Sequence, residues 1–353
     1  TVTLVTDGVP AVAGKAAAAA VTAGAVTIDA GAALKTVTVN GYSTGSISLA
    51  AAALDTISLA NGAAFAINDT ADTLGLTLEK VTGAITFTTA PTTLNVKSVG
   101  NNTIGNLAAT QTKALNVSGT GTLSAAANSL GALETIVVTE TAGLNLGAIQ
   151  QATVKSVNTT GTTGAVTVSV NGTVATYTGG AGKDNVTIYN DAAITKAINL
   201  GAGDVTLNLT GLAAGSLTGI AAANVLQGGD GTDIIALSAA AADSVSSGAV
   251  FEARINGFER LSVGSVGANT LVNLDNMDDI NYVISNGSTA GTYKLDKMLA
   301  NATVELKGAH FAGIEVALKD ATGEADAVNL ITNFTGDIGT VTVADGGTID
   351  VTT

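Results

Sequence analysis

The chain of 353 residues has no cysteine, no tryptophan, two prolines, and aromatic residues at only 3% of its composition. Without cysteine there can be no disulfide framework, which is compatible with export to a cell surface but does not demonstrate it. The scarcity of aromatic residues predicts a narrow core of Val, Ile, Leu and Ala. No apolar run reaches the roughly 18 residues that a transmembrane helix needs, so no membrane-spanning segment is predicted.

Positive charge is also scarce, since 14 Lys and Arg face 28 Asp and Glu and leave a formal net charge of −14. This balance disfavours binding to nucleic acid or to an anionic membrane surface. It suits a protein that collects cations, and Ca²⁺ is the expected partner. The chain begins at Thr1, which predicts a processed form or an excised segment.

What the chain has in abundance is glycine, threonine, valine and alanine. Thr and Val favour strands and Gly favours turns, so the composition predicts an all-β protein with many short strands. Hydrophobic residues reach 46%, which argues against a disordered chain. Local helical character is limited to residues 239–249 and 294–300, which are rich in Ala, Leu, Met and Lys.

Strand-like pieces recur along residues 25–160 with a period near 20. Each alternates apolar residues with Thr, Ser or Asn, the pattern of a strand with one buried face. In one set of strands, the first apolar residue expected to be buried recurs every 18 to 21 residues. These residues are Val37, Ile57, Leu76, Leu94, Leu115, Ile136 and Val157. A second set lies between them. The period predicts a parallel β-solenoid of about 20-residue coils, each with at least two strands.

Asn-Gly pairs at the expected corners leave one structural alternative open. Such pairs also form two-residue hairpins, so an antiparallel β-sandwich fold is the competing prediction. The spacing near 20, rather than the 8 to 12 expected of sandwich strands, favours the solenoid.

Residues 228–236 read GGDGTDIIA and match the nonapeptide G-G-x-G-x-D-x-U-x of calcium-binding β-rolls. Residues 179–187 read GGAGKDNVT and form an imperfect copy. Glycine permits tight turns with carbonyls directed at an ion, and the sixth-position Asp supplies a charged oxygen. Between the copies, Asp204 follows Asp184 by one coil length, which predicts that the two side chains face one edge. This segment departs from the motif, because Val205 occupies the position at which an Asp would complete G-x-G-x-D.

These patterns divide the chain into a β-solenoid segment at 1–175, a calcium-binding segment at 176–240 and a C-terminal β-rich segment at 241–353. The order of parts across residues 177–263 resembles RTX-type S-layer proteins of Gram-negative bacteria, the Caulobacter type. The resemblance implies type I secretion, calcium-dependent folding, and self-assembly into a two-dimensional lattice on the extracellular surface. Members of that family attach to lipopolysaccharide, although no corresponding anchor is evident in this sequence.

The resemblance also implies a set of calcium ligands. One motif gives only half of a site, because Ca²⁺ takes six to eight oxygens and needs a neighbouring coil. The implied ligands are the carboxylates of Asp184 and Asp233, the carbonyls around Gly180, Gly182, Gly229 and Gly231, and Asp230 and Asp204 as additional ligands.

Two other functions share this sequence pattern. A surface adhesin or biofilm protein would have the same fold, charge and calcium. A polysaccharide-modifying β-helix enzyme would need clustered acids and bases. The sequence offers one histidine, His310, and two arginines, Arg254 and Arg260. His310 is expected to be a turn or surface residue, and the protein is predicted not to be an enzyme.

Overall fold

The computed structural model describes residues 2–5, 26–30, 34–49, 54–189, 193–220, 226–277, 280–320, 322, 326–344 and 348–352. The chain divides into two compact units. The first comprises Thr1–Val170 with Gly180–Gly182, and the second comprises Asn171–Gly179 with Lys183–Thr353.

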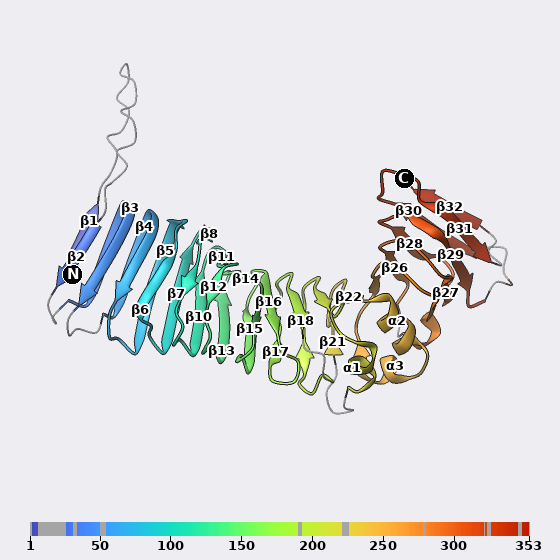
Figure 1. The fold of residues 1–353 in the computed structure, drawn as a ribbon, viewed down its shortest axis with the longest axis horizontal. Helices are drawn as coiled ribbons and strands as arrows, with labels where there is room; N and C mark the ends of the chain where they lie inside the picture. Colours follow the sequence, from blue (N-terminus) through green and yellow to red (C-terminus); the bar gives the residue numbers. More distant parts are fainter. Residues whose placement is uncertain are drawn as a thin grey trace, which may run out of the picture. The chain divides into compact units, whose positions relative to one another are not determined.

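The first unit consists of strands of successive coils that lie side by side and run parallel (Figure 1). One sheet contains β1 (Val2–Val5), β2 (Val26–Ala30), β3 (Thr36–Leu49), β4 (Thr56–Asn68), β5 (Thr73–Val81), β6 (Ile85–Thr89), β7 (Thr93–Val99), β9 (Leu107–Ala108), β10 (Ala114–Gly119), β12 (Asn128–Ser129), β13 (Thr135–Glu140) and β15 (Ser156–Thr162). The other contains β8 (Asn102–Thr103), β11 (Leu123–Ser124), β14 (Leu144–Gln151) and β16 (Val166–Val170).

Pairing in this unit confirms the repeat and corrects its register at one point. Leu76 pairs with Val96, not with Leu94. The partner of Leu94 in the preceding coil is Leu74. In the following coils Leu94 pairs with Leu115, and Leu115 with Ile136, as predicted. From Leu94 onward the predicted positions therefore lie one alternation earlier along their strands than the positions predicted in the preceding coils. A shift of this kind keeps the same face of the strand buried, so the alternation of side chains could not reveal it.

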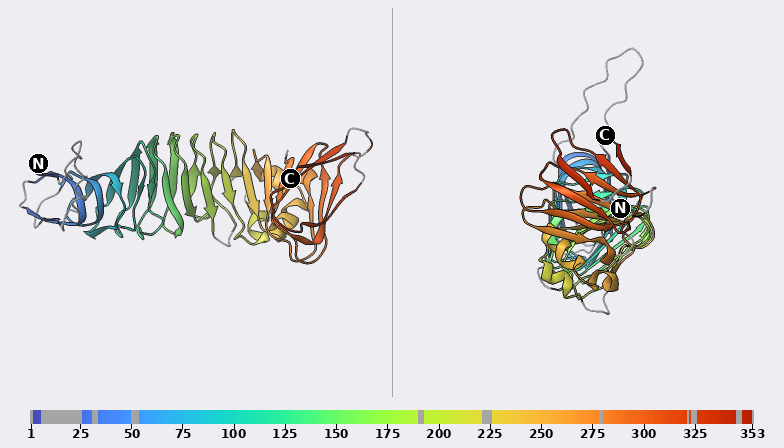
Figure 2. Two further views of the ribbon diagram at one scale, coloured as in Figure 1. Left: turned by 90° about the horizontal axis from the view of Figure 1, so that it is seen from above. Right: turned by 90° about the vertical axis from the view of Figure 1, so that its right-hand side faces the viewer.

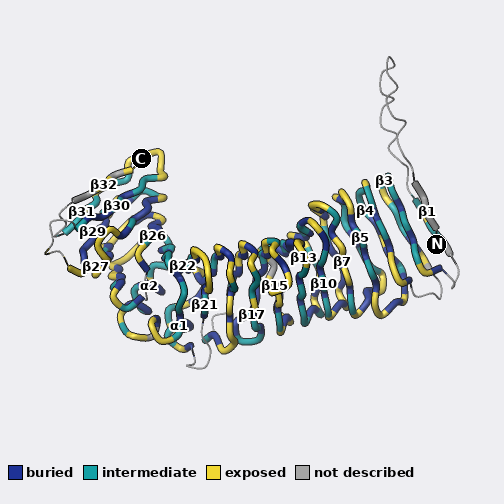
Figure 3. Tube along the Cα trace, turned by 180° about the vertical axis from the view of Figure 1, so that it is seen from behind, coloured by how far each residue is buried: buried dark blue, intermediate teal, exposed yellow. Residues whose placement is uncertain are grey.

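The predicted alternation of buried and less buried residues is visible along much of the chain (Figure 3) and is regular in β7, β10 and β13. Apolar residues fill the interior, and polar residues on the outer face pair with their counterparts one coil away. Asn61 donates to Asn40 and Asn116 donates to Asn95, both at 2.7 Å. Outside the sheet, the Lys155 ammonium binds Glu134 at 2.8 Å and lowers the pKa of that carboxyl. Such coil-to-coil contacts hold each turn on the next.

The second unit contains three groups of parallel strands, again side by side (Figure 2). The first group is β17 (Thr176–Thr178), β19 (Ile198–Asn199), β21 (Leu226–Gln227) and β23 (Ile255–Asn256). The second is β18 (Asn185–Ile188), β20 (Thr206–Asn208), β22 (Ile234–Leu237), β24 (Arg260–Val263), β26 (Tyr282–Ser285), β28 (Ala302–Leu306), β30 (Ala327–Thr332) and β32 (Thr348–Thr352). The third is β25 (Thr270–Asn273), β27 (Tyr293–Met298), β29 (His310–Leu318) and β31 (Gly339–Ala344).

Short helices interrupt the second unit at α1 (Ala214–Thr218), α2 (Ala239–Ser246), α3 (Val250–Arg254) and the 3₁₀ turn η1 (Leu274–Asn276). Helix α2 confirms the helical character predicted at 239–249, and the Ser238 side chain caps it by accepting from the Ala241 amide. The helix predicted at 294–300 is wrong. That segment lies largely in β27, where pairing with β25 and β29 on both sides outweighs local helix propensity.

The described strands pair in parallel wherever their register is defined, so the fold is an all-β parallel β-solenoid with a few short helices. The antiparallel sandwich alternative is therefore wrong. Two of the predicted corner pairs, Asn40-Gly41 and Asn61-Gly62, lie inside the long strands β3 and β4. There, Gly41 and Asn61 take positive φ angles of 74° and 49° and bend the chain without reversing it. Among the described helices, none has the length and apolarity needed to cross a membrane.

Candidate metal centre

Asp233 lies directly before β22, and its side chain is fully buried. Its Oδ1 accepts a hydrogen bond from the Val205 amide at 3.0 Å. Its Oδ2 is buried and has no hydrogen-bond partner in the structure. An unpartnered carboxylate oxygen in the interior is costly, because burial removes the water that would otherwise solvate it.

Two glycines border this free oxygen. A Cβ at Gly228 would lie 2.7 Å from Asp233 Oδ2 and 1.8 Å from the Gly257 carbonyl oxygen. Only glycine fits there. Because glycine has no side chain, Asp233 Oδ2 and the Gly257 carbonyl oxygen both border the space that a Cβ would fill. Gly257 turns at a φ of 68° one coil further on. Carboxylate and carbonyl oxygens are the ligands that Ca²⁺ prefers.

The electrostatic surroundings of Asp233 are strongly acidic. The pKa of Asp233 is raised to about 6, mainly by burial and also by the negative charges of Glu259, Asp204 and Asp230, against the opposing hydrogen bond from Val205. The Glu259 carboxylate, in the adjacent coil, also accepts a hydrogen bond from the Asp233 amide at 2.8 Å, and this bond holds the Glu259 side chain in position. At neutral pH Asp233 is therefore ionised in a place that favours a compensating cation.

The remaining predicted residues of the second motif form the turn before Asp233. Gly229, Asp230 and Gly231 are exposed, and the two glycines have φ angles of 110° and 140°. A Cβ at Gly229 would lie 1.8 Å from the Gly201 carbonyl oxygen, which also accepts the Asp230 amide. The turn thus packs tightly on the preceding coil. Asp230 contributes charge to the site without being buried in it.

Asp204 lies one residue away from its predicted column. Strand pairing matches Thr206 with Asn185 and with Ile234, so the residue that corresponds to Asp184 and Asp233 is Val205. The exposed Asp204 carboxylate binds the Lys183 ammonium at 2.9 Å and accepts the Thr232 amide at 3.1 Å. The hydrogen bond from Lys183 is the main cause that lowers the pKa of Asp204. The Asp204 carboxylate is therefore already paired with a cationic side chain.

The first motif differs from the second in how its Asp is satisfied. Asp184 is buried, and its Oδ2 accepts a hydrogen bond of 2.5 Å from the Tyr177 hydroxyl. Gly180 and Gly182 are grouped with the first unit, and the Gly180 amide donates to Thr159 Oγ1 there. Asp184 belongs to the second unit. In this motif a protein hydroxyl supplies the donor that Asp233 lacks.

The difference between the two motifs traces to one position. Tyr177 precedes Asp184 by seven residues, and Leu226 precedes Asp233 by seven. Tyr177 pairs with Ile198, which pairs with Leu226, so the tyrosine and the leucine occupy the same column of the second unit. Leucine has no hydroxyl, and Asp233 Oδ2 is left free. This common seven-residue spacing is the signal in the sequence that identifies the position.

The candidate catalytic residues have structural contacts instead. His310 is fully buried in β29 and its Nε2 lies 2.7 Å from Ser285 Oγ, so its prediction as a turn or surface residue is wrong. Burial lowers the pKa of His310. Arg254 donates to the Ile220 carbonyl, and the Arg260 guanidinium stacks 4.3 Å above the Tyr282 ring.

The tight turn at Gly257 gives a direct test of the local geometry. Gly257→Ala is expected to lower the free energy of unfolding by about 1–2 kcal/mol, because a side chain is strained at its left-handed φ. Urea unfolding followed by circular dichroism measures the change. Gly211→Ala is the matched control, since nothing lies within 4 Å of its Cβ position, and it should be close to neutral. Equal losses in both variants would contradict this geometry.

The donor set around Asp233 fits a hard cation held partly by backbone. Among the residues that the structure describes, no three His, Cys, Asp or Glu side chains converge as a metal-binding group. A calcium ion here would therefore combine the Asp233 carboxylate with carbonyl oxygens and water, as six to eight ligands require. Comparison with known proteins adds no relative: no family model, no curated protein and no solved structure matches this chain.

Proposed function

We propose that this protein is a structural component of a bacterial surface layer, in which bound calcium fastens the coils of a β-solenoid that assembles with copies of itself. The observation that carries the proposal is the buried, unpartnered Oδ2 of Asp233 beside the Gly257 carbonyl. In a nonapeptide that matches calcium-binding β-rolls, this oxygen is the place where a cation would complete the fold.

In this proposal Asp233 is the central ligand. The other oxygen donors that we assign to the ion are the Gly257 carbonyl, the carbonyls of the turn around Gly229 and Gly231, and Asp230. Calcium, when bound, supplies a positive charge beside Asp233, Glu259 and Asp230, whereas Asp204 is already paired with Lys183. The Asp184 motif plays a different part, because Tyr177 already donates to its carboxylate.

A structural, non-catalytic role is supported by what the ionisable side chains do. His310, Arg254 and Arg260 contact Ser285, a backbone carbonyl and an aromatic ring. The net charge of −14 favours calcium-bridged contacts between copies and leaves free copies mutually repulsive. We further propose an extracellular location after type I secretion, with attachment to lipopolysaccharide through a region not evident in this sequence.

Negative-stain electron microscopy tests the assembly. In millimolar CaCl₂ the protein should form ordered two-dimensional sheets, and excess EGTA should return it to dispersed particles. Asp233→Asn should form sheets poorly at the same calcium concentration, whereas Asp204→Asn should assemble like the wild type. Dispersed monomers or simple fibres in calcium, at every protein concentration tried, would contradict the surface-layer proposal and favour the adhesin.

A further inference from the structure

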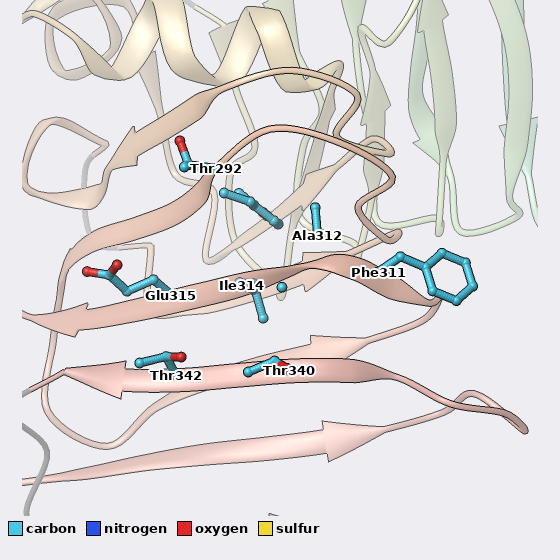
Figure 4. A pocket seen from close by; sticks show the side chains of 9 residues that line it. Thr292, Phe311, Ala312, Ile314, Glu315, Thr340 and Thr342 are labelled. Carbon is cyan, nitrogen blue, oxygen red and sulfur yellow. The ribbon is translucent and has the colours of Figure 1, made fainter.

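The outer face of the sheet β25-β27-β29-β31 carries two adjoining hollows that the calcium site does not involve. One has a volume of about 280 Å³ and the other about 420 Å³, and they share Thr292, Tyr293 and Glu315. Together they have the size of a site for a small molecule or a few units of a polymer. Figure 4 shows Phe311 and Glu315 at opposite ends of a segment of β29, with Thr340 and Thr342 on the neighbouring strand.

A bulge in β29 builds the first hollow. His310 pairs with Gly339 and Ile314 pairs with Val341, so four steps along β29 correspond to two along β31. The two additional residues turn Phe311 outward, where 74% of its surface is exposed. Bulges commonly re-aim side chains beside binding sites. The Gly313 carbonyl in the bulge is fixed by the Ser288 hydroxyl at 3.0 Å.

The floor beneath the hollows is rigid. Tyr293 lines both hollows and is 2% exposed, and its ring stacks on the buried His310 with centroids 6.4 Å apart. His310 in turn bonds Ser285. A ligand on this surface would therefore meet a preorganised platform, which lowers the entropic cost of binding.

A row of side chains crosses the sheet from one hollow to the other. Register places Leu271, Lys294, Glu315 and Thr342 opposite one another on the four strands. The Lys294 ammonium lies 3.1 Å from Glu315 and 3.5 Å from Asp296. Two carboxylates thus neutralise the lysine, and the surface offers no unbalanced positive charge for an anionic ligand.

From this arrangement we propose that the groove formed by the two hollows binds a neutral glycan chain. Phe311 offers an exposed aromatic face for the C–H surface of a sugar ring, and Thr340, Thr342 and Glu315 offer groups that hydrogen-bond to its hydroxyls. A peptide that adds a strand would pair at β25 or β31, the end strands of this sheet, and would extend the sheet sideways. It would not lie over the groove between them, where β27 and β29 are paired on both sides. This inference does not depend on the calcium site.

Isothermal titration calorimetry of the full chain in EGTA, where the protein is expected to be dispersed, tests the proposal with cellohexaose, maltohexaose and chitohexaose as neutral probes and hexagalacturonate as the anionic probe. At least one neutral hexasaccharide should bind with a dissociation constant on the order of 0.1–1 mM. Phe311→Ala should weaken that binding at least tenfold without altering the thermal unfolding curve, because the side chain is mostly exposed.

Phe334→Ala is the matched control, since Phe334 is also exposed, at 37%, but lines neither hollow. It should change the dissociation constant less than twofold. Asp233→Asn should retain glycan binding, which separates failure of this inference from failure of the calcium site. Binding of hexagalacturonate alone, no binding of any neutral probe at millimolar concentration, or equal binding by Phe311→Ala and wild type would overturn the proposal.

Discussion

Adding calcium to the metal-free protein is expected to raise its free energy of unfolding, and Asp233→Asn is expected to remove that response. A ligand that binds only the folded state stabilises it by about 2.7 kcal/mol when its concentration is 100 times its dissociation constant. The Asp233 carboxylate is the buried charge that the ion would compensate. Urea unfolding in CaCl₂ and in EGTA at pH 7.5 measures the difference.

The pKa of Asp233 sharpens this prediction in the metal-free state. The pKa is raised from 3.8 to about 6 on folding, so the folded state prefers the protonated acid. The metal-free protein therefore loses stability as pH rises from about 4 to 6, and by pH 7.5 the cost is about 2–3 kcal/mol. Asp233→Asn carries no such charge and its Oδ1 can still accept from Val205. In EGTA it should be at least as stable as the wild type.

The control for this experiment is Asp204→Asn, which removes an acid from the neighbouring coil. Asp204 is exposed and paired with Lys183, so its loss should change the free energy of unfolding little and leave the calcium response intact. Hydrogen exchange should show calcium protecting residues 226–237 while residues 36–160 change little. A wild-type protein indifferent to calcium, or an Asp233→Asn variant that responds like wild type, would exclude Asp233 as the ligand.

Leu226→Tyr is expected to make the second motif independent of calcium. The substitution places a tyrosine seven residues before Asp233, as Tyr177 stands before Asp184, and in the same column. Its hydroxyl can donate to Asp233 Oδ2, which removes both the unpartnered oxygen and the ion's main ligand. We expect the stability in EGTA to rise by about 1–3 kcal/mol, less any cost of fitting the larger ring.

Leu226→Phe is the matched control, because it adds the ring without the hydroxyl. It should show the cost of overpacking and keep the calcium response, so the difference between the two variants isolates the hydrogen bond. Calcium titrations followed by unfolding free energy measure both. If Leu226→Tyr binds calcium as tightly as the wild type, the parallel between the two motifs is incorrect.

The period of the solenoid could be predicted because it is local. Alternating Thr and Val set which face is buried, and a spacing near 20 set the coil length. The exact register could not be predicted, as the exchange of Leu94 for Val96 opposite Leu76 shows. Both residues point inward, so the two registers bury the same face and differ only in contacts with neighbouring coils.

The candidate site was predicted only in part for a similar reason. The motif identified Asp233, but the residues that surround it come from coils longer than those of the first unit. Ile234 pairs with Thr206 in the preceding coil and with Arg260 in the following one, and both steps exceed the period read from the sequence. That period could not place Gly257 or Glu259 beside Asp233. The burial of His310 was missed because its neighbour Ser285 lies on another strand, far from it in the sequence.

The constant spacing between paired residues in successive coils of the first unit determines how such a chain can become longer during evolution. Leu94, Leu115, Ile136 and Val157 follow one another at equal intervals and stack in one column. Duplicating one such interval in the gene would add a complete coil and leave every other residue facing as before. Inserting a single residue within a strand would instead turn the following side chains inside out. Selection on length would therefore act in whole coils.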